Sequence, residues 1–260
     1  MSRWSSWWRS GPRVSGRPPS ANGASSFHLN WGPVDDAIGV SVVLEVLEAP
    51  SVPALYFWAL QADMAGPRGR AGGAHLGLQW YPHHPGSTAV NWGGYAAHGG
   101  ELAGSDSRLP SATGNPNTRD LAWRAGRAYR LSIRRVEHQE GPSGTTRWRG
   151  AVQDLTQGDQ VEVRDLYMGG DRIVGATMWS EVFARCDDPS VAVRWSAPTL
   201  HLADRDVAVD RVQVNYQSHD AGGCANTDSA ADGVGLVQRT SVERRTPQGT
   251  VLAVPAAQQR

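Results

Sequence analysis

Apolar and polar residues alternate with a period of two along most of the chain from Ser26 onward. An alternating segment predicts a β-strand with one buried face and one wet face. Residues 40–47 and 55–60 are more continuously apolar and predict strands that are covered on both faces. Their β-branched and aromatic content, and the nearby Pro50 and Pro53, argue against a helix. The alternation is clearest in residues 76–80, 129–134, 191–195 and 212–217.

Short segments between these strands extend the same pattern. Clusters of Gly, Pro, Asn and Asp separate about a dozen predicted strands, and no amphipathic helix longer than about ten residues is found. We therefore expect an all-β protein, a single jelly-roll sandwich. Residues 1–25 are predicted to be a flexible basic arm, 26–238 the sandwich and 239–260 an edge strand or tail. The additional strands are expected at residues 27–31, 88–92, 147–155, 161–166, 177–183 and 200–209.

One stretch resembles the concanavalin A-like jelly-roll sandwiches. A strand with basic residues (129–135) is followed by a hairpin that carries Trp148 and the turn Asp154-Leu-Thr-Gln-Gly158. The pair of strands at 56–61 and 75–80 fits the same architecture. The resemblance spans residues 55–195 and implies a sandwich that in this family hosts lectins, glycosidases and protein-binding modules. The Glu-x-Asp-x-x-Glu strand of the glucanase members is missing.

The charged residues exclude several functions. All 25 basic residues are Arg, which rules out a catalytic lysine or a P-loop lysine. Between the basic ends, 17 Arg stand against 24 acidic residues, which is a poor surface for nucleic acid. No signal peptide and no apolar run of about 20 residues is visible, so we expect a soluble protein without a transmembrane segment. It is taken as cytoplasmic by default, with export left open.

The two cysteines, Cys186 and Cys224, are too few for a four-thiolate zinc site and do not form a CxxC motif. Whether they pair is left open. The histidines form no metal motif. The residue counts permit a Ser-His-Asp triad, but the Gly-x-Ser-x-Gly elbow of the α/β-hydrolases is missing.

The densest group of candidate ligand contacts lies between residues 79 and 95. Tryptophan and tyrosine rings could stack on sugar rings, while planar amides donate and accept hydrogen bonds. The alternative is that the tryptophans belong to the core. The predicted carbohydrate contacts are Gln79, Trp80, Asn91, Trp92, Tyr95 and Arg119.

Three other groups of residues carry candidate chemistry. The long loop at residues 95–123 carries a polar group, which could bind hydroxyls or carboxylates or could be a plain surface loop. Glu181 lies between two aromatic residues on an alternating strand and could be a general acid with a raised pKa, or could pair with Arg185 or Arg194. Asn226, Asp228 and Asp232 could bind calcium or could form ordinary turns. The residues of the loop group are Asn115, Asn117, Arg119 and Asp120, with His98, Glu101 and Asp106 upstream.

Tryptophan enrichment, with 11 Trp against 3 Phe, makes a non-catalytic, lectin-like carbohydrate-binding domain the leading expectation. The first alternative is a polysaccharide hydrolase or lyase on the same sandwich with Glu181 as the acid. In that case Glu181→Gln should abolish turnover. The second alternative is a partner-binding module that docks a protein through Trp4, Trp7 and Trp8 of the arm.

Overall fold

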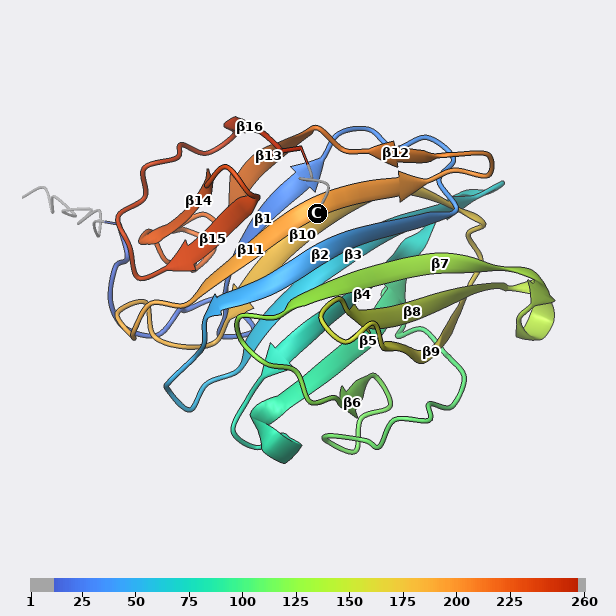
Figure 1. The fold of residues 1–260 in the computed structure, drawn as a ribbon, viewed down its shortest axis with the longest axis horizontal. Coiled ribbons are helices and arrows are strands. Elements are labelled where there is room, and N and C mark those ends of the chain that lie inside the picture. The colour runs from blue at the N-terminus through green and yellow to red at the C-terminus, as the bar shows by residue number, and fades with distance from the viewer. Residues whose placement is uncertain (1–11, 257–260) are drawn as a thin grey trace, which may run out of the picture.

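The computed structural model describes residues 12–256, apart from the side chains of residues 138 and 139. It confirms an all-β sandwich made of two antiparallel sheets (Figure 1). The three tryptophans of the predicted docking arm lie outside the described residues. In residues 12–256 no helix is long and apolar enough to cross a membrane.

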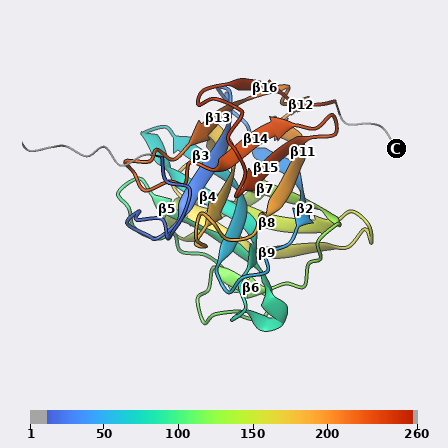
Figure 2. The same ribbon diagram turned by 90° about the vertical axis from the view of Figure 1, so that its left-hand side faces the viewer.

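Sheet A is the sheet that carries the candidate site described below. Its eight strands are, in spatial order, β16 (Val251–Ala253), β13 (Arg211–Tyr216), β1 (Ser25–Trp31), β10 (Arg172–Val182), β3 (Tyr56–Gly66), β4 (Gly69–Trp80), β5 (Thr88–Ala96) and β6 (Thr118–Asp120). In both views of the molecule, β6 lies at the end opposite β16 (Figure 2).

Sheet B packs against one face of sheet A. Its strands are, in spatial order, β14 (Thr227–Ala231), β15 (Leu236–Thr240), β11 (Ala192–His201), β2 (Gly39–Glu48), β7 (Ala128–Glu140), β8 (Thr146–Asp154) and β9 (Gln160–Met168), and β12 (Asp206–Ala208) pairs with β11. The only helical elements within the described residues are two 3-10 turns, at Pro85–Ser87 and Pro142–Gly144.

The core lies between the two sheets and is built around large aromatic side chains. Trp58, Trp92, Trp148 and Trp195 are all fully buried. Gln238 connects the layers, because its Oε1 accepts hydrogen bonds from Trp195 Nε1 of sheet B at 2.9 Å and from a serine hydroxyl of sheet A at 2.8 Å. Most of the tryptophans among residues 12–256 therefore serve the core.

The strands predicted from alternation form at the expected places, and most extend further than the pattern indicates. One differs: the single strand expected at 200–209 is the end of β11, a turn and then β12. The short strands β6 and β14 were not predicted, nor was β15 as an interior strand of sheet B.

The cysteines form a disulfide bond, with 5.6 Å between the Cα atoms of Cys186 and Cys224. Part of the predicted arm lies against this bond: the backbone N–H of Cys186 donates to Gly16 O at 2.9 Å, and that of Ala225 donates to Arg13 O. Residues 13–16 are thus tied to the sandwich by backbone hydrogen bonds.

Candidate ligand groove on the outer face of sheet A

The face of sheet A that points away from sheet B carries one polar residue at the same level on five neighbouring strands. Asn30 of β1 pairs in register with Gln213 of β13 and with Thr177 of β10. Gln61 of β3 pairs with Thr177 on one side and with His75 of β4 on the other. We call these five residues the polar row. Side chains in register on neighbouring strands lie about 5 Å apart, so the row crosses the sheet without a gap.

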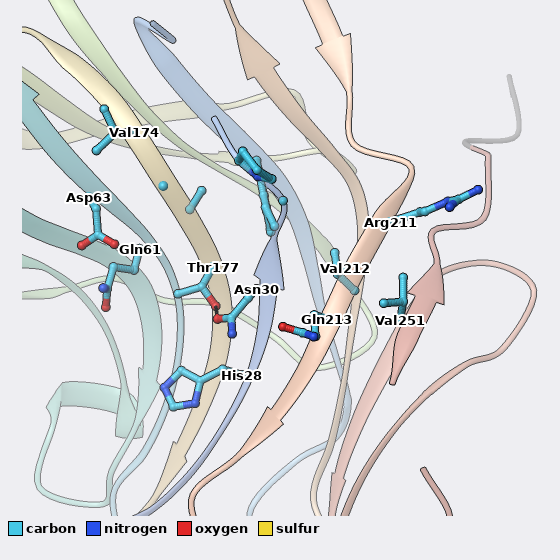
Figure 3. A pocket seen from close by; sticks show the side chains of 15 residues that line it. His28, Asn30, Gln61, Asp63, Val174, Thr177, Arg211, Val212, Gln213 and Val251 are labelled. Carbon is cyan, nitrogen blue, oxygen red and sulfur yellow. Dashed lines mark hydrogen bonds between the residues drawn. The ribbon is translucent and has the colours of Figure 1, made fainter. Parts of the chain in front are cut away.

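Two adjoining hollows follow the polar row. The larger has a volume of 650 Å³ and is lined by residues of β1, β10, β3 and β13, including His28 and Asn30. The smaller, of 330 Å³, is lined by residues of β3, β4 and β5, including His75 and Tyr95. Gln61 and Asp63 line both hollows, which therefore form one groove across the sheet. Figure 3 shows His28, Asn30 and Thr177 beside Gln61 and Asp63.

The polar row retains unused hydrogen-bonding capacity. Thr177 Oγ1 lies 2.9 Å from Asn30 Oδ1 and 3.1 Å from the carbonyl of Leu29, so its single proton is used within the row. The side-chain amide of Gln61 makes no hydrogen bond to any residue that the structure describes, and neither does Asn30 Nδ2. These amide groups can both donate to and accept from a ligand.

A buried aromatic cluster adjoins the polar row. The rings of Phe57 and Trp179 meet edge to face with centroids 4.9 Å apart, and both side chains are buried although they lie on the outer face. His28 and His75 contact Trp179 at centroid distances of 6.2 and 5.8 Å. Burial lowers the pKa of His75 to about 4, against the opposing effect of a hydrogen bond with Asn91, and burial also lowers that of His28. Both imidazoles are therefore neutral at pH 7.

Glu181 lies on the same face of β10 as Trp179. Burial raises the pKa of its carboxyl group, while hydrogen bonds from Asn22 at 2.8 Å and from Ser26 act in the opposite direction. Neither predicted arginine pairs with it: Arg185 pairs with Asp187, and Arg194 pairs with Glu45 and Asp232.

None of the carboxylates Asp63, Glu45 and Asp165 faces Glu181 at the separation that a glycosidase needs. Asp63 aligns with Gly175, six residues along β10 from Glu181, or about 20 Å at the rise of a strand. Two-carboxylate glycosidases need roughly 5–10 Å. Glu45 and Asp165 are engaged elsewhere: Glu45 pairs with Arg194 in sheet B, and Asp165 is buried between Arg147 and Arg149.

The predicted sugar platform does not form one surface. Gln79 and Asn91 lie on the outer face of sheet A, whereas their chain neighbours Trp80 and Trp92 point inward, because consecutive residues of a strand face opposite sides. Trp92 is 0% exposed, and Trp80 contacts Tyr56 edge to face. Asn91 Nδ2 donates to Thr118 Oγ1 at 2.9 Å, and Gln79 is buried.

The remaining two predicted carbohydrate contacts, Tyr95 and Arg119, are separated from each other. Tyr95 is 56% exposed and lines the smaller hollow of the groove. Arg119 Nε donates to Pro116 O at 2.9 Å. In the loop at 95–123, Asn117 is buried, and its Nδ2 donates to Glu101 Oε1. This part of the loop is packed against the sheet.

The three predicted calcium ligands serve separate internal contacts. Asn226 Nδ2 donates to Cys186 O at 2.7 Å. Asp228 Oδ1 accepts from backbone N–H groups at Arg245 and Thr246, and Asp232 pairs with Arg194. No group of three or more His, Cys, Asp or Glu residues that could hold a metal ion occurs among residues 12–256. Calcium binding stays a prediction.

The sequence pattern does not single out the main groove residues. His28, Asn30, Gln61 and Thr177 each occupy the polar position of an alternating segment, which is the one signal that marks them. Their meeting depends on the pairing of β1 and β3 with β10, which lies more than 100 residues away in sequence.

No protein-family model matches the chain, and no curated protein sequence matches it. Among solved structures, scytalido-glutamic peptidase with a peptide-based transition-state analogue is similar at 13% identity and a TM-score of 0.46, covering 84% of this chain and 98% of that one. A second structure of that peptidase, with a transition-state analogue inhibitor, has 13% identity, a TM-score of 0.44 and coverage of 83% and 98%. SCP-B, a member of the eqolisin family of peptidases in complex with the tripeptide Ala-Ile-His, has 12% identity, a TM-score of 0.44 and the same coverage.

The prediction of a non-catalytic, carbohydrate-binding lectin-like domain is wrong. The tryptophans that motivated the prediction are unsuitable, since Trp92 is fully buried in the core and faces away from the amides that should accompany it.

Proposed function

We propose that the groove on sheet A binds a polypeptide in an extended conformation. The observation that carries the proposal is the polar row, in which the amides of Asn30 and Gln61 face the groove with unused donors and acceptors. A peptide group also donates and accepts, so a side-chain amide complements it from either direction. The groove extends from β13 to β5, which suits a linear chain.

The buried aromatic cluster beside the groove offers no ring face to a sugar. Sugar binding needs an exposed, flat ring face, whereas Phe57 and Trp179 are buried and meet edge to face. His28 and His75, which line the two hollows, contact Trp179, and their uncharged rings can pack against the side chain of a bound residue.

The proposal is tested by retention of a library of unstructured peptides on the immobilised protein, read by mass spectrometry. We expect the wild-type protein to retain a defined subset, and Gln61→Ala to weaken retention by about tenfold, the cost of roughly one hydrogen bond. Gln157→Ala removes an exposed amide in the turn after β8 and is the matched control. No retention by the folded wild-type protein, or equal retention by Gln61→Ala, would contradict the proposal.

Hydrolysis of the bound peptide is a second candidate function, and Asp63 favours it. The position that a Cβ atom would take at Gly73 lies 2.9 Å from Asp63 Oδ1 and 3.9 Å from Gln61 Nε2. A carboxylate and an amide donor thus face the same space, where the first can accept a proton from water and the second can donate to a carbonyl oxygen. Arg70 Nη2 lies 3.1 Å from Asp63 Oδ1 and forms an ion pair with it.

Mass spectrometry of the same library also detects cleavage products, and these distinguish peptide hydrolysis from peptide binding alone. Asp63→Asn should abolish cleavage and leave retention in place. If the wild-type protein retains peptides without cleaving them, the binding proposal stands and the hydrolytic one falls. The earlier alternative, with Glu181 as the acid, predicts instead that Glu181→Gln abolishes turnover.

Three finer predictions accompany this proposal. The disulfide bond supports an oxidising compartment and therefore export rather than the cytoplasm. A protein partner for residues 1–25 stays a prediction, and deleting only residues 1–11 would test it without removing the backbone contacts of Arg13 and Gly16. The narrower assignment to the concanavalin A-like jelly rolls also stays a prediction.

A further inference from the structure

A hydrogen-bonded chain of Ser41, His201 and Asp206 lies on the outer face of sheet B, on the other sheet from the groove. Ser41 Oγ is 2.9 Å from His201 Nε2. His201 Nδ1 is 2.6 Å from Asp206 Oδ1. A hydroxyl, an imidazole and a carboxylate in this order form the nucleophile, base and orienting group of serine-type acyl transfer.

The shorter contact, with Asp206, assigns the proton positions. An ionised carboxylate only accepts hydrogen bonds, so His201 Nδ1 carries a proton and donates it to Asp206, and Arg134 Nη2, 3.0 Å from the same nitrogen, then makes no hydrogen bond to it. Nε2 then carries a lone pair, and the Ser41 hydroxyl donates to it. This is the tautomer in which the imidazole can remove the serine proton.

Three strands bring the groups together. In β2, Gly39 pairs with His201 of β11 on one side and with Arg134 of β7 on the other. A Cβ atom at Gly39 would lie 2.9 Å from Arg134 Cγ and 3.4 Å from His201 Cδ2, so glycine leaves the space in which these side chains meet beside Ser41. The hairpin from β11 to β12 returns Asp206 opposite His201.

Burial, together with two neighbouring positive charges, keeps the imidazole in its basic form. Burial is the main cause that lowers the pKa of His201, and the positive charges of Arg134 and Arg130 lower it further, while Asp206 raises it. The hydrogen bond from His201 lowers the pKa of the Asp206 carboxyl group. At pH 7 the site therefore holds a neutral histidine beside an ionised aspartate, with Arg134 Nη2 3.0 Å from His201 Nδ1.

We propose that Ser41 is the nucleophile of a second site, which transfers the acyl group of small carboxylic esters to water. Ser41 Oγ forms a bond to the acyl carbon as its proton passes to His201 Nε2. The C–O bond of the ester breaks, and the leaving alcohol takes that proton. Water then attacks the acyl-serine and gives a proton to His201, the bond to Oγ breaks, and Ser41 regains the proton as the carboxylic acid leaves.

The burial of the site determines the size of the substrate. Ser41 and His201 are each 5% exposed, whereas the side chain of Asp206 is 64% exposed. A bulky acyl group would not reach Ser41 Oγ, so the proposal is limited to small groups such as acetyl.

The experiment treats the full chain with a small fluorophosphonate, maps the adduct by peptide mass spectrometry, and measures hydrolysis of p-nitrophenyl acetate. Ser132 of β7 is the matched control, because it pairs in register with Ser41 on the same face and its Oγ lies 3.4 Å from Ala151 O instead of near an imidazole. We expect an adduct at Ser41 in the wild-type protein and in Ser132→Ala, and none in Ser41→Ala.

Asp206→Asn tests the orienting role of the carboxylate and leaves the two buried side chains, Ser41 and His201, in place. We expect labelling and ester hydrolysis to fall by about tenfold or more, because the imidazole loses the carboxylate that favours its active tautomer and its protonated form. Thermal unfolding midpoints confirm that each variant is folded. The proposal is overturned if the folded wild-type protein gains no adduct at Ser41, or if Asp206→Asn reacts as fast as the wild type.

Discussion

Glu181 is a carboxyl group whose burial favours the protonated form in the folded protein, with a pKa above its ordinary value of 4.5. Below pH 4.5 the carboxyl group is largely protonated in both the folded and the unfolded state. Its contribution to the free energy of unfolding is then fully present. As the pH rises through the raised pKa, the unfolded chain has already released the proton, so that contribution is lost. We therefore expect the free energy of unfolding to fall with pH above about 4.5 more steeply in the wild type than in Glu181→Gln.

Urea unfolding at several pH values between about 4 and 8 measures this difference. The side-chain amide that Glu181→Gln introduces stays neutral and still accepts the hydrogen bond from Asn22 through its oxygen. Glu243→Gln, at a side chain that is 81% exposed, is the control and should leave the slope unchanged. Parallel pH profiles for the wild type and Glu181→Gln would show that the burial of Glu181 has no energetic consequence.

Trp92 illustrates what a residue type alone fails to indicate. Tryptophan and asparagine side by side suggest a sugar site by composition, yet Asn91 and Trp92 occupy adjacent positions of β5 and must face opposite sides. The strand pattern was available in the sequence and predicts this outcome, whereas the tryptophan count does not. Gly150 on β8 of sheet B leaves room for the Trp92 ring in the core, since a Cβ atom at position 150 would lie 2.8 Å from that ring.

At the scale of the strand, Gly77 allows β4 to approach β3 closely. A Cβ atom at this position would lie 2.1 Å from Trp58 O and 2.6 Å from Ala59 Cα, which are backbone atoms that cannot rotate away. We expect Gly77→Ala to lower the free energy of unfolding by about 1–3 kcal/mol, the usual cost of overpacking. Denaturant unfolding checks this.

Gly169→Ala is the matched control, because a Cβ atom at Gly169 would meet nothing within 4 Å. It should change stability by less than about 0.5 kcal/mol. Equal stability of Gly77→Ala and Gly169→Ala would mean that β3 and β4 can separate without cost, and the close approach would then not account for the glycine.

Alternation predicts individual strands well and their partners poorly. The segments at 129–134 and 212–217 carry large apolar residues every second position, so burial of one face identifies them. The strand β14 has the sequence Thr-Asp-Ser-Ala-Ala and no such signal; it is a strand because it pairs with β15. The groove depends on long-range register in the same way, since Gln61 and Thr177 are neighbours only through the pairing of β3 with β10.

At the scale of the molecule, the disulfide bond joins two connections between the sheets. Cys186 lies between β10 of sheet A and β11 of sheet B, and Cys224 lies between β13 of sheet A and β14 of sheet B. The bond therefore fixes two crossings at once, and it also positions residues 13–16, whose carbonyls accept hydrogen bonds from Cys186 and Ala225.

The bond closes a loop with a sequence separation of 38, which limits the conformations of the unfolded chain. For a loop of this length the chain-entropy model gives a stabilisation of roughly 4 kcal/mol. We expect Cys186→Ala/Cys224→Ala to unfold at correspondingly lower urea than the oxidised wild type, and reduction of the wild type to produce a similar shift. The reductant should leave the double variant unchanged, since it has no other cysteine. If reduction leaves the urea midpoint of the wild type unchanged, the packing between the sheets alone fixes the two connections, and the bond adds no thermodynamic stability.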